Sequence, residues 1–523
     1  MTSLKNTTLR LLSKVGAGTT ALRLYDSFTD YTGTVDESIS SFDEDTGENG
    51  YVVFPLIPGY RTFCLRYSIL ADAFRRRGYS PILLVDDVTD VPVERAVDDD
   101  RTISVQTSYF EKRIPEKFGL EVTGISEYLS STEVDINESS EIIERYSIDT
   151  FAKGSTRRRL KRYSLDLDET EVVREYERFL SLGILLARSV EQLLSVHNTE
   201  LVVVHEPYYI QGGVPMSVAR AKGVRSYSQG FGFRNGTLIF GGQSERSSLP
   251  HFTSESVVRS QIDTALSSEE ASRVDEIMYG RESGQEMSID YSSHTNQTAA
   301  SDGVVSVGMF TNLLWDASLE PEYALYSDVF EWVSDTITAF EDIPDAELII
   351  KTHPAESKRG TRESVTSRIR EDFSPLPDNV KLLHPDTDVD TYALIDSLDA
   401  SVVYNSTVGL ESAYRGLPVI VAGETHYRGF GFTIDPETKQ EYLALLNDVS
   451  QIEPPEETET LAQRYAHLLM AKRHTPFPYF VLDVAQEQEF KKITAADTKP
   501  GSEPIETLVT SMLNGDEVVH PST

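Results

Sequence analysis

Short apolar runs alternate with longer amphipathic segments along most of the chain. The run YVVFPL, at residues 51–56, is followed by the segment IPGYRT and then by apolar positions at helical spacing from Leu65 to Phe74. The strand pattern PILLVDD comes next, after Gly78. A strand, a helix and a second strand in this order predict a βαβ unit and hence a parallel sheet.

The same alternation returns twice. A long helical pattern at 172–197 leads into the run LVVVHEP, and from residue 303 five runs follow in VVSVGMF, ELIIKTHP, VKLLHP, DASVVYNST and PVIVAGE. Two such series predict an α/β protein of two Rossmann-like, doubly wound domains with an interdomain cleft. Ligands of such sheets bind beyond the carboxyl ends of the strands.

Changes of composition divide the chain into five parts. We expect an N-terminal helical extension at 1–50 and a first Rossmann-like domain at 51–253, with a helical insertion at about 90–170 where the sequence turns polar and acidic. The Ser-, Glu- and Gln-rich stretch 254–302 predicts a linker. A second Rossmann-like domain at 303–450 and C-terminal helices with a tail at 451–523 complete the chain.

The chain is strongly acidic, with a formal charge of −36 over 523 residues. Acidic residues along its whole length argue against nucleic-acid binding, which requires a basic surface. The excess favours a high-salt cytoplasm, where salt screens self-repulsion, although an acidic mesophilic protein has the same composition.

Cysteine content and the N-terminal sequence bear on disulfides, metal sites and secretion. The only cysteine, Cys64, excludes an intramolecular disulfide and a zinc site built on several cysteines. The first 28 residues lack the continuous apolar stretch of a secretory signal, so we expect a cytoplasmic protein.

Polar residues follow two strands of the second domain directly. In YNSTVGLESAYRG, the residues Asn405, Ser406 and Thr407 end a strand, and Ser406 or Thr407 can cap the next helix. A helix N-terminus and two hydroxyls suit phosphate oxygens, and Gly409 allows a close approach to the backbone. Glu411 lies one turn further, where a carboxylate can accept from ribose hydroxyls. An ordinary capped helix is the alternative.

His353 and Pro354 close the strand run ELIIKTHP, which also contains Lys351. An imidazole at the carboxyl end of a strand can donate a hydrogen bond or a proton to a departing phosphate.

The segments KTHP, HPDTDVDTYALID and DASVVYNSTVGLESAYRGLPVIVAGETHYRGFG resemble the GT-B glycosyltransferases of capsule and surface polysaccharide synthesis, the family that includes Kdo transferases. The resemblance covers Lys351 to Gly431. It implies that His353 and Pro354 act as an HP motif and that Ser406 and Thr407 act as a Ser/Thr motif, both on the donor phosphates.

The resemblance also implies a nucleotide-sugar donor, with cytidine-linked donors among the options, and a glycan or polyprenyl-phosphate-linked acceptor. It implies no cofactor and no catalytic metal. Asp386, Asp388 and Asp390 have the Asp-x-Asp spacing of a metal site, but a solvated loop and helix start is our preferred interpretation. Arg428, in the Gly-rich THYRGFG segment, is a further candidate for the phosphate charge, with a plain surface loop as the alternative.

The first domain offers candidates for the acceptor side. Gly59, Tyr60 and Arg61 follow the first strand, and His205 and Glu206 end the strand LVVVHEP, where either can act as general base. Gln229 ends the following strand and can line the acceptor site.

A basic cluster interrupts the acidity at STRRRLKRYS, from Arg157 to Arg162. It is a candidate for peripheral contact with the membrane or with a phosphate-bearing acceptor, or it is a solvated helix face paired with the acidic DLDETE downstream. The sequence therefore predicts a metal-independent glycosyltransferase. A nucleotide-sugar epimerase of the same fold and a non-catalytic polysaccharide-assembly scaffold are the alternatives.

Overall fold

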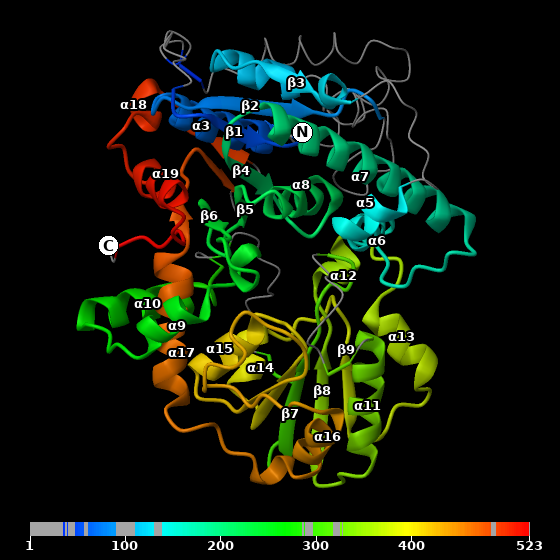
Figure 1. The fold of residues 1–523 in the computed structure, drawn as a ribbon. Helices are drawn as coiled ribbons and strands as arrows, with labels where there is room; N and C mark the ends of the chain where they lie inside the picture. The colour runs from blue at the N-terminus through cyan, green and yellow to red at the C-terminus, as the bar shows by residue number, and fades with distance from the viewer. Residues whose placement is uncertain are drawn as a thin grey trace.

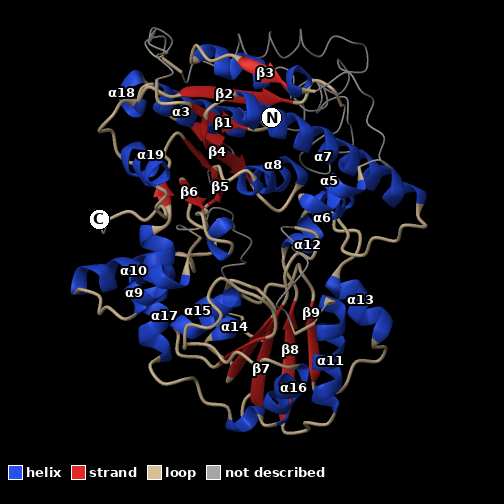
Figure 2. Cartoon of the chain, in the orientation of Figure 1, coloured by secondary structure: helices blue, strands red, loops and turns tan. Residues whose placement is uncertain are grey.

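The computed structural model describes residues 35–36, 39, 48–56, 61–89, 110–129, 139–284, 287, 297–316, 325–326, 328–482 and 488–521. Two sheets, each covered by helices on both faces, form the two halves of the molecule (Figures 1 and 2). The predicted N-terminal helical extension lies almost entirely outside the described residues.

The first sheet has seven strands in the order β12-β6-β5-β4-β1-β2-β3. The five strands from β5 to β3 are parallel, whereas β6 and β12 are antiparallel additions at one edge. Its strands are β1 (Tyr51–Phe54), β2 (Ser80–Val85), β3 (Val122–Gly124), β4 (Thr199–His205), β5 (Arg225–Phe231), β6 (Thr237–Phe240) and β12 (Thr475–Pro476).

Helices on both faces of this sheet bury the apolar side chains that alternate along its strands. On one face lie α3 (Arg61–Arg75) and α19 (Ile505–Asn514), and on the other lie α6 (Ile148–Leu160), α7 (Thr170–Val196) and α8 (Ile210–Ala221). Within the described residues, α7 alone has the length and apolar character of a membrane span, but 56% of its most apolar window is buried in the protein. It is therefore accounted for as a core helix of the first domain.

The second sheet is fully parallel, in the order β11-β10-β7-β8-β9. Its strands are β7 (Val305–Phe310), β8 (Ala346–Lys351), β9 (Val380–Leu383), β10 (Ala400–Val403) and β11 (Val419–Val421). Its helices are α11 (Val329–Glu341), α12 (Ala355–Lys358), α13 (Val365–Asp372), α14 (Thr391–Ile395), α15 (Val408–Tyr414) and α16 (Lys439–Asn447). The two sheet topologies confirm the predicted pair of Rossmann-like domains.

Two segments differ from the sequence-based expectation. The insertion contains the helices α5 (Ser140–Arg145) and α6, but it also contributes β3, which extends the first sheet. The stretch expected as a linker contains α9 (Glu255–Ile262) and α10 (Ser268–Gly280). Val258, Ile262, Val274 and Ile277 of these helices are buried in one cluster with residues of the second domain.

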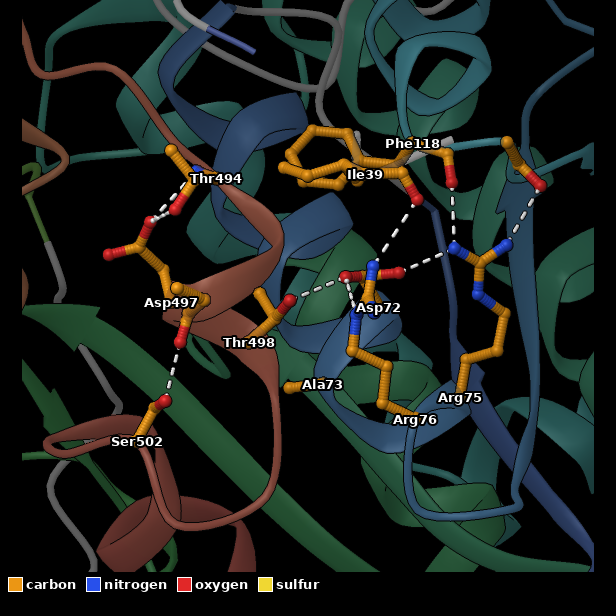
Figure 3. Close-up of polar contacts among 12 residues, drawn as sticks. Ile39, Asp72, Ala73, Arg75, Arg76, Phe118, Thr494, Asp497, Thr498 and Ser502 are labelled. Carbon is orange, nitrogen blue, oxygen red and sulfur yellow. Dashed lines mark hydrogen bonds and ion pairs between the residues drawn. The ribbon is translucent and has the colours of Figure 1, made fainter. Parts of the chain in front are cut away.

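The end of the chain crosses back onto the first domain. After α17 (Thr458–Ala466) and a π-helical turn (His467–Lys472), β12 joins the first sheet, and α18 (Ala495–Thr498) and α19 pack on α3. Figure 3 shows the polar part of this contact, in which the buried carboxylate of Asp72 accepts from Arg75 at 2.5 Å, Arg76 at 2.7 Å and Thr498 at 2.6 Å.

Candidate functional site

Each sheet has a point at which its strand order reverses. In the second sheet β8 and β9 lie on one side of β7, and β10 and β11 lie on the other, so the loops after β7 and β10 diverge. In the first sheet the same reversal separates β1 from β4. Ligands of doubly wound sheets bind in the crevice between such diverging loops. We call these two places the switch points.

The two switch points face each other. Tyr209, in the loop after β4, donates a hydrogen bond of 2.8 Å from its hydroxyl to Oδ1 of Asp316, in the loop after β7. The guanidinium of Arg158 on α6 lies 4.4 Å from the centre of the Tyr209 ring, and its Nε lies 4.0 Å from the same Asp316 oxygen. The carboxyl ends of the two sheets therefore meet at one interface.

His353 follows β8, close enough to Asp316 for the charge of that carboxylate to act on its imidazole. The backbone N–H of Ala355 donates to its Nδ1 at 3.1 Å, so in the neutral ring the proton is on Nε2. Burial and nearby cations, led by Arg359, lower the pKa of His353 to about 4. The imidazole is neutral at physiological pH and offers an N–H donor. Pro354 is the N-cap residue of the short helix α12.

Glu206 lies opposite, at the end of β4. Its carboxylate pairs with Arg158 at 2.5 Å and lies 3.5 Å from Nε2 of the buried His205. Burial raises the pKa of Glu206, but the charge and hydrogen bond of Arg158, together with the charge of Arg66, outweigh burial and lower it to about 2. Its backbone φ of 39° lies in the left-handed region, a strained conformation typical of functional positions.

The loop after β10 carries the Ser/Thr pair. Asn405 is exposed, and the Ser406 hydroxyl accepts from the backbone N–H of Val408 at 3.3 Å. Thr407 is the N-cap residue of α15 but makes no side-chain cap bond. The predicted capping role therefore falls to Ser406.

Four predicted donor-site residues are engaged within the protein. The Lys351 ammonium donates to the carbonyl of Val389 at 2.8 Å, and the Arg428 guanidinium donates to the carbonyls of Val421 and Pro436. A side chain at Gly409 would collide with the Tyr427 hydroxyl, so this glycine makes room for a protein ring.

The fourth of these residues, Glu411, is buried and forms an ion pair of 2.7 Å with Arg281. These contacts stabilise the second domain. On the donor side, Nε2–H of His353, the exposed Asn405 and the hydroxyls of Ser406 and Thr407 remain the candidates for contact with a ligand.

The predicted acceptor-side residues are described in part. Gly59 and Tyr60 lie outside the described residues, and Arg61 begins α3, but its side chain is not described. Gln229 is fully buried beside His205 in the sheet register, and its amide has no hydrogen-bond partner in the described part of the chain.

The Asp-x-Asp segment has the role of a loop and helix start. Asp390 caps α14 by accepting from the N–H groups of Tyr392 and Ala393, and Asp386 accepts from the Ser357 hydroxyl. Across the residues that the structure describes, no group of three or more potential ligands is arranged to hold a metal ion.

The basic cluster is engaged within the protein. Arg158 pairs with Glu206, Arg162 pairs with Glu169 at 2.6 Å, and the Lys161 ammonium donates to the carbonyl of Arg359 in the second domain at 2.5 Å. Figure 1 shows α6 beside α12 at this contact. The Lys161 contact joins the two domains, and the Arg162 pair matches the predicted pairing with DLDETE.

Sequence reasoning missed Arg158, Tyr209 and Asp316 as site residues. Tyr209 lies four residues after the end of β4 and Asp316 lies beyond the end of β7, so both follow strand ends as the predicted residues do. Arg158 was predicted only as part of the basic cluster, because its partners Glu206, Tyr209 and Asp316 are distant in the chain.

Comparisons with known proteins agree with the resemblance. Residues 332–463 match the model of the family described as capsule polysaccharide biosynthesis protein. The second domain carries the capsule-synthesis pattern. This match confirms the resemblance inferred from the HP and Ser/Thr segments.

No curated protein matches the chain. Among solved structures, the chain is similar to the KpsC β-Kdo 2,4 transferase of Thermosulfurimonas dismutans, with 16% identity over 60% of this chain and 87% of the other and a TM-score of 0.37. It is also similar to the glycosyltransferase SnogD of Streptomyces nogalater, with 12% identity over 82% and 96% and a TM-score of 0.26.

Proposed function

We propose that the protein is a metal-independent glycosyltransferase that moves a sugar from a nucleotide-activated donor to a surface glycan or lipid-linked acceptor. The observation that carries the proposal is the Tyr209–Asp316 contact, because it joins the switch points of two Rossmann-like sheets. The second domain, which carries the family pattern, binds the donor, and the first domain binds the acceptor. The nucleotide-sugar is a substrate, and no cofactor takes part.

The donor phosphate is met by a neutral imidazole. Because Nδ1 of His353 accepts from Ala355, Nε2–H is the group that donates to a phosphate oxygen. Such a bond strengthens as the leaving phosphate gains charge while its bond to the sugar breaks. The Ser406 and Thr407 hydroxyls, after β10, supply further donors to the same group. The family resemblance includes cytidine-linked donors among the options and leaves the base of the nucleotide open.

The acceptor hydroxyl is deprotonated on the other side, as its oxygen forms the new bond to the anomeric carbon. Glu206 is held as an ion pair, and a carboxylate with a pKa of about 2 is a weak base. The donor phosphate provides a competing anion for Arg158, and its arrival raises the basicity of Glu206. His205, 3.5 Å from Glu206, is the alternative base.

This proposal includes a cytoplasmic protein, with its acceptor in solution or at the inner face of the membrane. Arg158, Lys161 and Arg162 are engaged in contacts within the protein. These contacts favour an acceptor that diffuses to the enzyme over binding of the basic cluster to lipid.

The experiment is an assay of nucleotide release from individual CMP-, UDP- and GDP-sugars. We expect release from one donor class, and a loss of at least tenfold in His353→Ala. The chain supplies a matched control in His384→Ala, because His384 also precedes a proline after a strand but has a half-exposed side chain at the edge strand β9. Release from no donor, or equal loss in both variants, contradicts the proposal.

A further inference from the structure

The loop that follows β7 stands at the donor-side switch point. Thr311 and Asn312 are its first residues, and β7 is the central strand of the second sheet. The residues Asn405 to Thr407 begin the diverging loop after the neighbouring strand β10. A ligand in the crevice between these loops contacts both of them.

Thr311 and Asn312 each bury a polar atom that lacks a partner. Thr311 is only 3% exposed, and neither its Oγ1 nor the Oδ1 of Asn312 has a hydrogen-bond partner among the described residues. The backbone of Thr311 is held in place, because its N–H donates to the carbonyl of Lys351 at 3.2 Å.

A neighbouring threonine shows the contrast. Thr352, the corresponding residue after β8, donates from Oγ1 to the carbonyl of Leu383 at 3.2 Å and accepts from the Thr366 hydroxyl at 3.1 Å. Folded proteins pair nearly all buried polar atoms, and each unpaired one costs about 1–3 kcal/mol. Two unpaired oxygens in consecutive residues at a switch point indicate a ligand that forms hydrogen bonds with them.

The chemistry of the two oxygens limits that ligand. An amide oxygen only accepts, so Asn312 Oδ1 requires a hydroxyl or N–H group, whereas a threonine hydroxyl also donates and suits a phosphate oxygen. A nucleotide-sugar presents both kinds of group on neighbouring atoms.

We propose that Thr311 and Asn312 form a donor subsite, in which Thr311 binds a phosphate oxygen of the nucleotide-sugar and Asn312 binds a hydroxyl of its ribose or sugar. The subsite rests on the proposed function and adds a third loop to the donor site.

The test is calorimetric titration of Thr311→Val and Asn312→Leu with CMP, CDP, UDP and GDP, together with thermal unfolding of each variant. Both substitutions nearly keep the side-chain shape and remove an unpaired oxygen. We therefore expect an unchanged or higher Tm and a five- to twentyfold weaker affinity for the nucleotide that the native chain binds.

The matched control is Thr336→Val on α11. The Thr336 hydroxyl is also buried, but it donates to the Trp332 carbonyl at 2.7 Å and lies 2.7 Å from the Tyr442 hydroxyl. We expect this variant to have a lower Tm and native nucleotide affinity, the reverse of the two subsite variants.

The outcomes separate this inference from the proposed function. Native affinity in Thr311→Val and Asn312→Leu overturns the subsite, because water is then the hydrogen-bond partner of the two oxygens. This outcome leaves the proposed function standing. Failure of the native chain to bind any of the four nucleotides overturns the proposed function and the subsite with it.

Discussion

One backbone hydrogen bond determines what His353 can offer a phosphate. Because Ala355 donates to Nδ1 and the pKa is lowered to about 4, the ring acts as a neutral N–H donor. A glutamine amide reaches a similar position with a similar donor. We therefore expect His353→Gln to keep most of the nucleotide affinity, whereas His353→Ala loses about 1.5–3 kcal/mol, the range for a hydrogen bond to a charged group. Equal losses by calorimetry in the two variants would mean that the ring acts as a cation.

The buried ion pair of Glu411 and Arg281 leads to a stability prediction. Removing one partner leaves an uncompensated buried charge, so Glu411→Ala should lower the free energy of unfolding by about 3–5 kcal/mol in urea denaturation. The double variant Arg281→Met, Glu411→Leu should recover most of that loss. Nucleotide affinity should not change in the double variant. A selective loss of affinity would return Glu411 to the ribose role inferred from the sequence.

Three histidines with lowered pKa values predict a loss of stability in acid. His251, His426 and His474 surround Phe233, and burial lowers the pKa of each, that of His251 to about 4. The unfolded chain takes up protons on these histidines near pH 6.5, and the folded chain does not. Above that pH they therefore cost the folded state no stability. As the pH falls from 6.5 toward 4, the free energy of unfolding decreases.

Each such histidine contributes a slope of about 1.4 kcal/mol per pH unit in that window. His251→Phe should reduce the slope of unfolding free energy by about that amount between pH 6 and 4.5. An unchanged slope would show that His251 is protonated in the folded protein.

The sequence predicted where residues at strand ends lie, but it did not predict the partners of residues on the helix α15. His353, Glu206 and Ser406 directly follow apolar runs, and a parallel sheet brings such positions to one edge. The partners of Glu411 and Gly409 come from other parts of the chain, Arg281 and Tyr427, so their roles followed only from the tertiary structure.

Among elements, the terminal helix α19 belongs to the core of the first domain. Ile505, Leu508, Val509 and Met512 are fully buried in the cluster formed by α3 and the first sheet. We expect Leu508→Ala to lower the free energy of unfolding by about 2–5 kcal/mol, and the exposed Thr510→Ala on the same helix to change it by less than about 0.5 kcal/mol. Equal effects in chemical denaturation would show that α19 is not docked on the first domain.

Long periodic elements followed from the sequence, and short or polar ones did not. The helix α7 and the longer strands of both sheets have clear apolar patterns. In contrast, β3 has only three residues, too few for a strand pattern to be visible. In α9, the buried Val258 and Ile262 lie among polar residues, and the composition of the stretch outweighed their helical spacing.

At the scale of the whole molecule, the charge of −36 predicts a dependence on salt. At 1 M salt the Debye length is about 3 Å, so repulsion between acidic side chains across the surface is screened. Salt also weakens exposed ion pairs, but these pairs add little to the stability of the protein. We expect Tm to rise by several degrees between 0.1 and 2 M KCl. A flat or falling Tm would favour the acidic mesophilic alternative.

The central claim is that the carboxyl end of the second sheet binds a nucleotide through His353. Calorimetric titration in multimolar KCl with CMP, CDP, UDP and GDP, on the native chain, His353→Ala and His384→Ala, tests it most directly. Our account predicts that one nucleotide binds the native chain and His384→Ala equally and binds His353→Ala at least tenfold more weakly. Binding of none, or native affinity in His353→Ala, would contradict it.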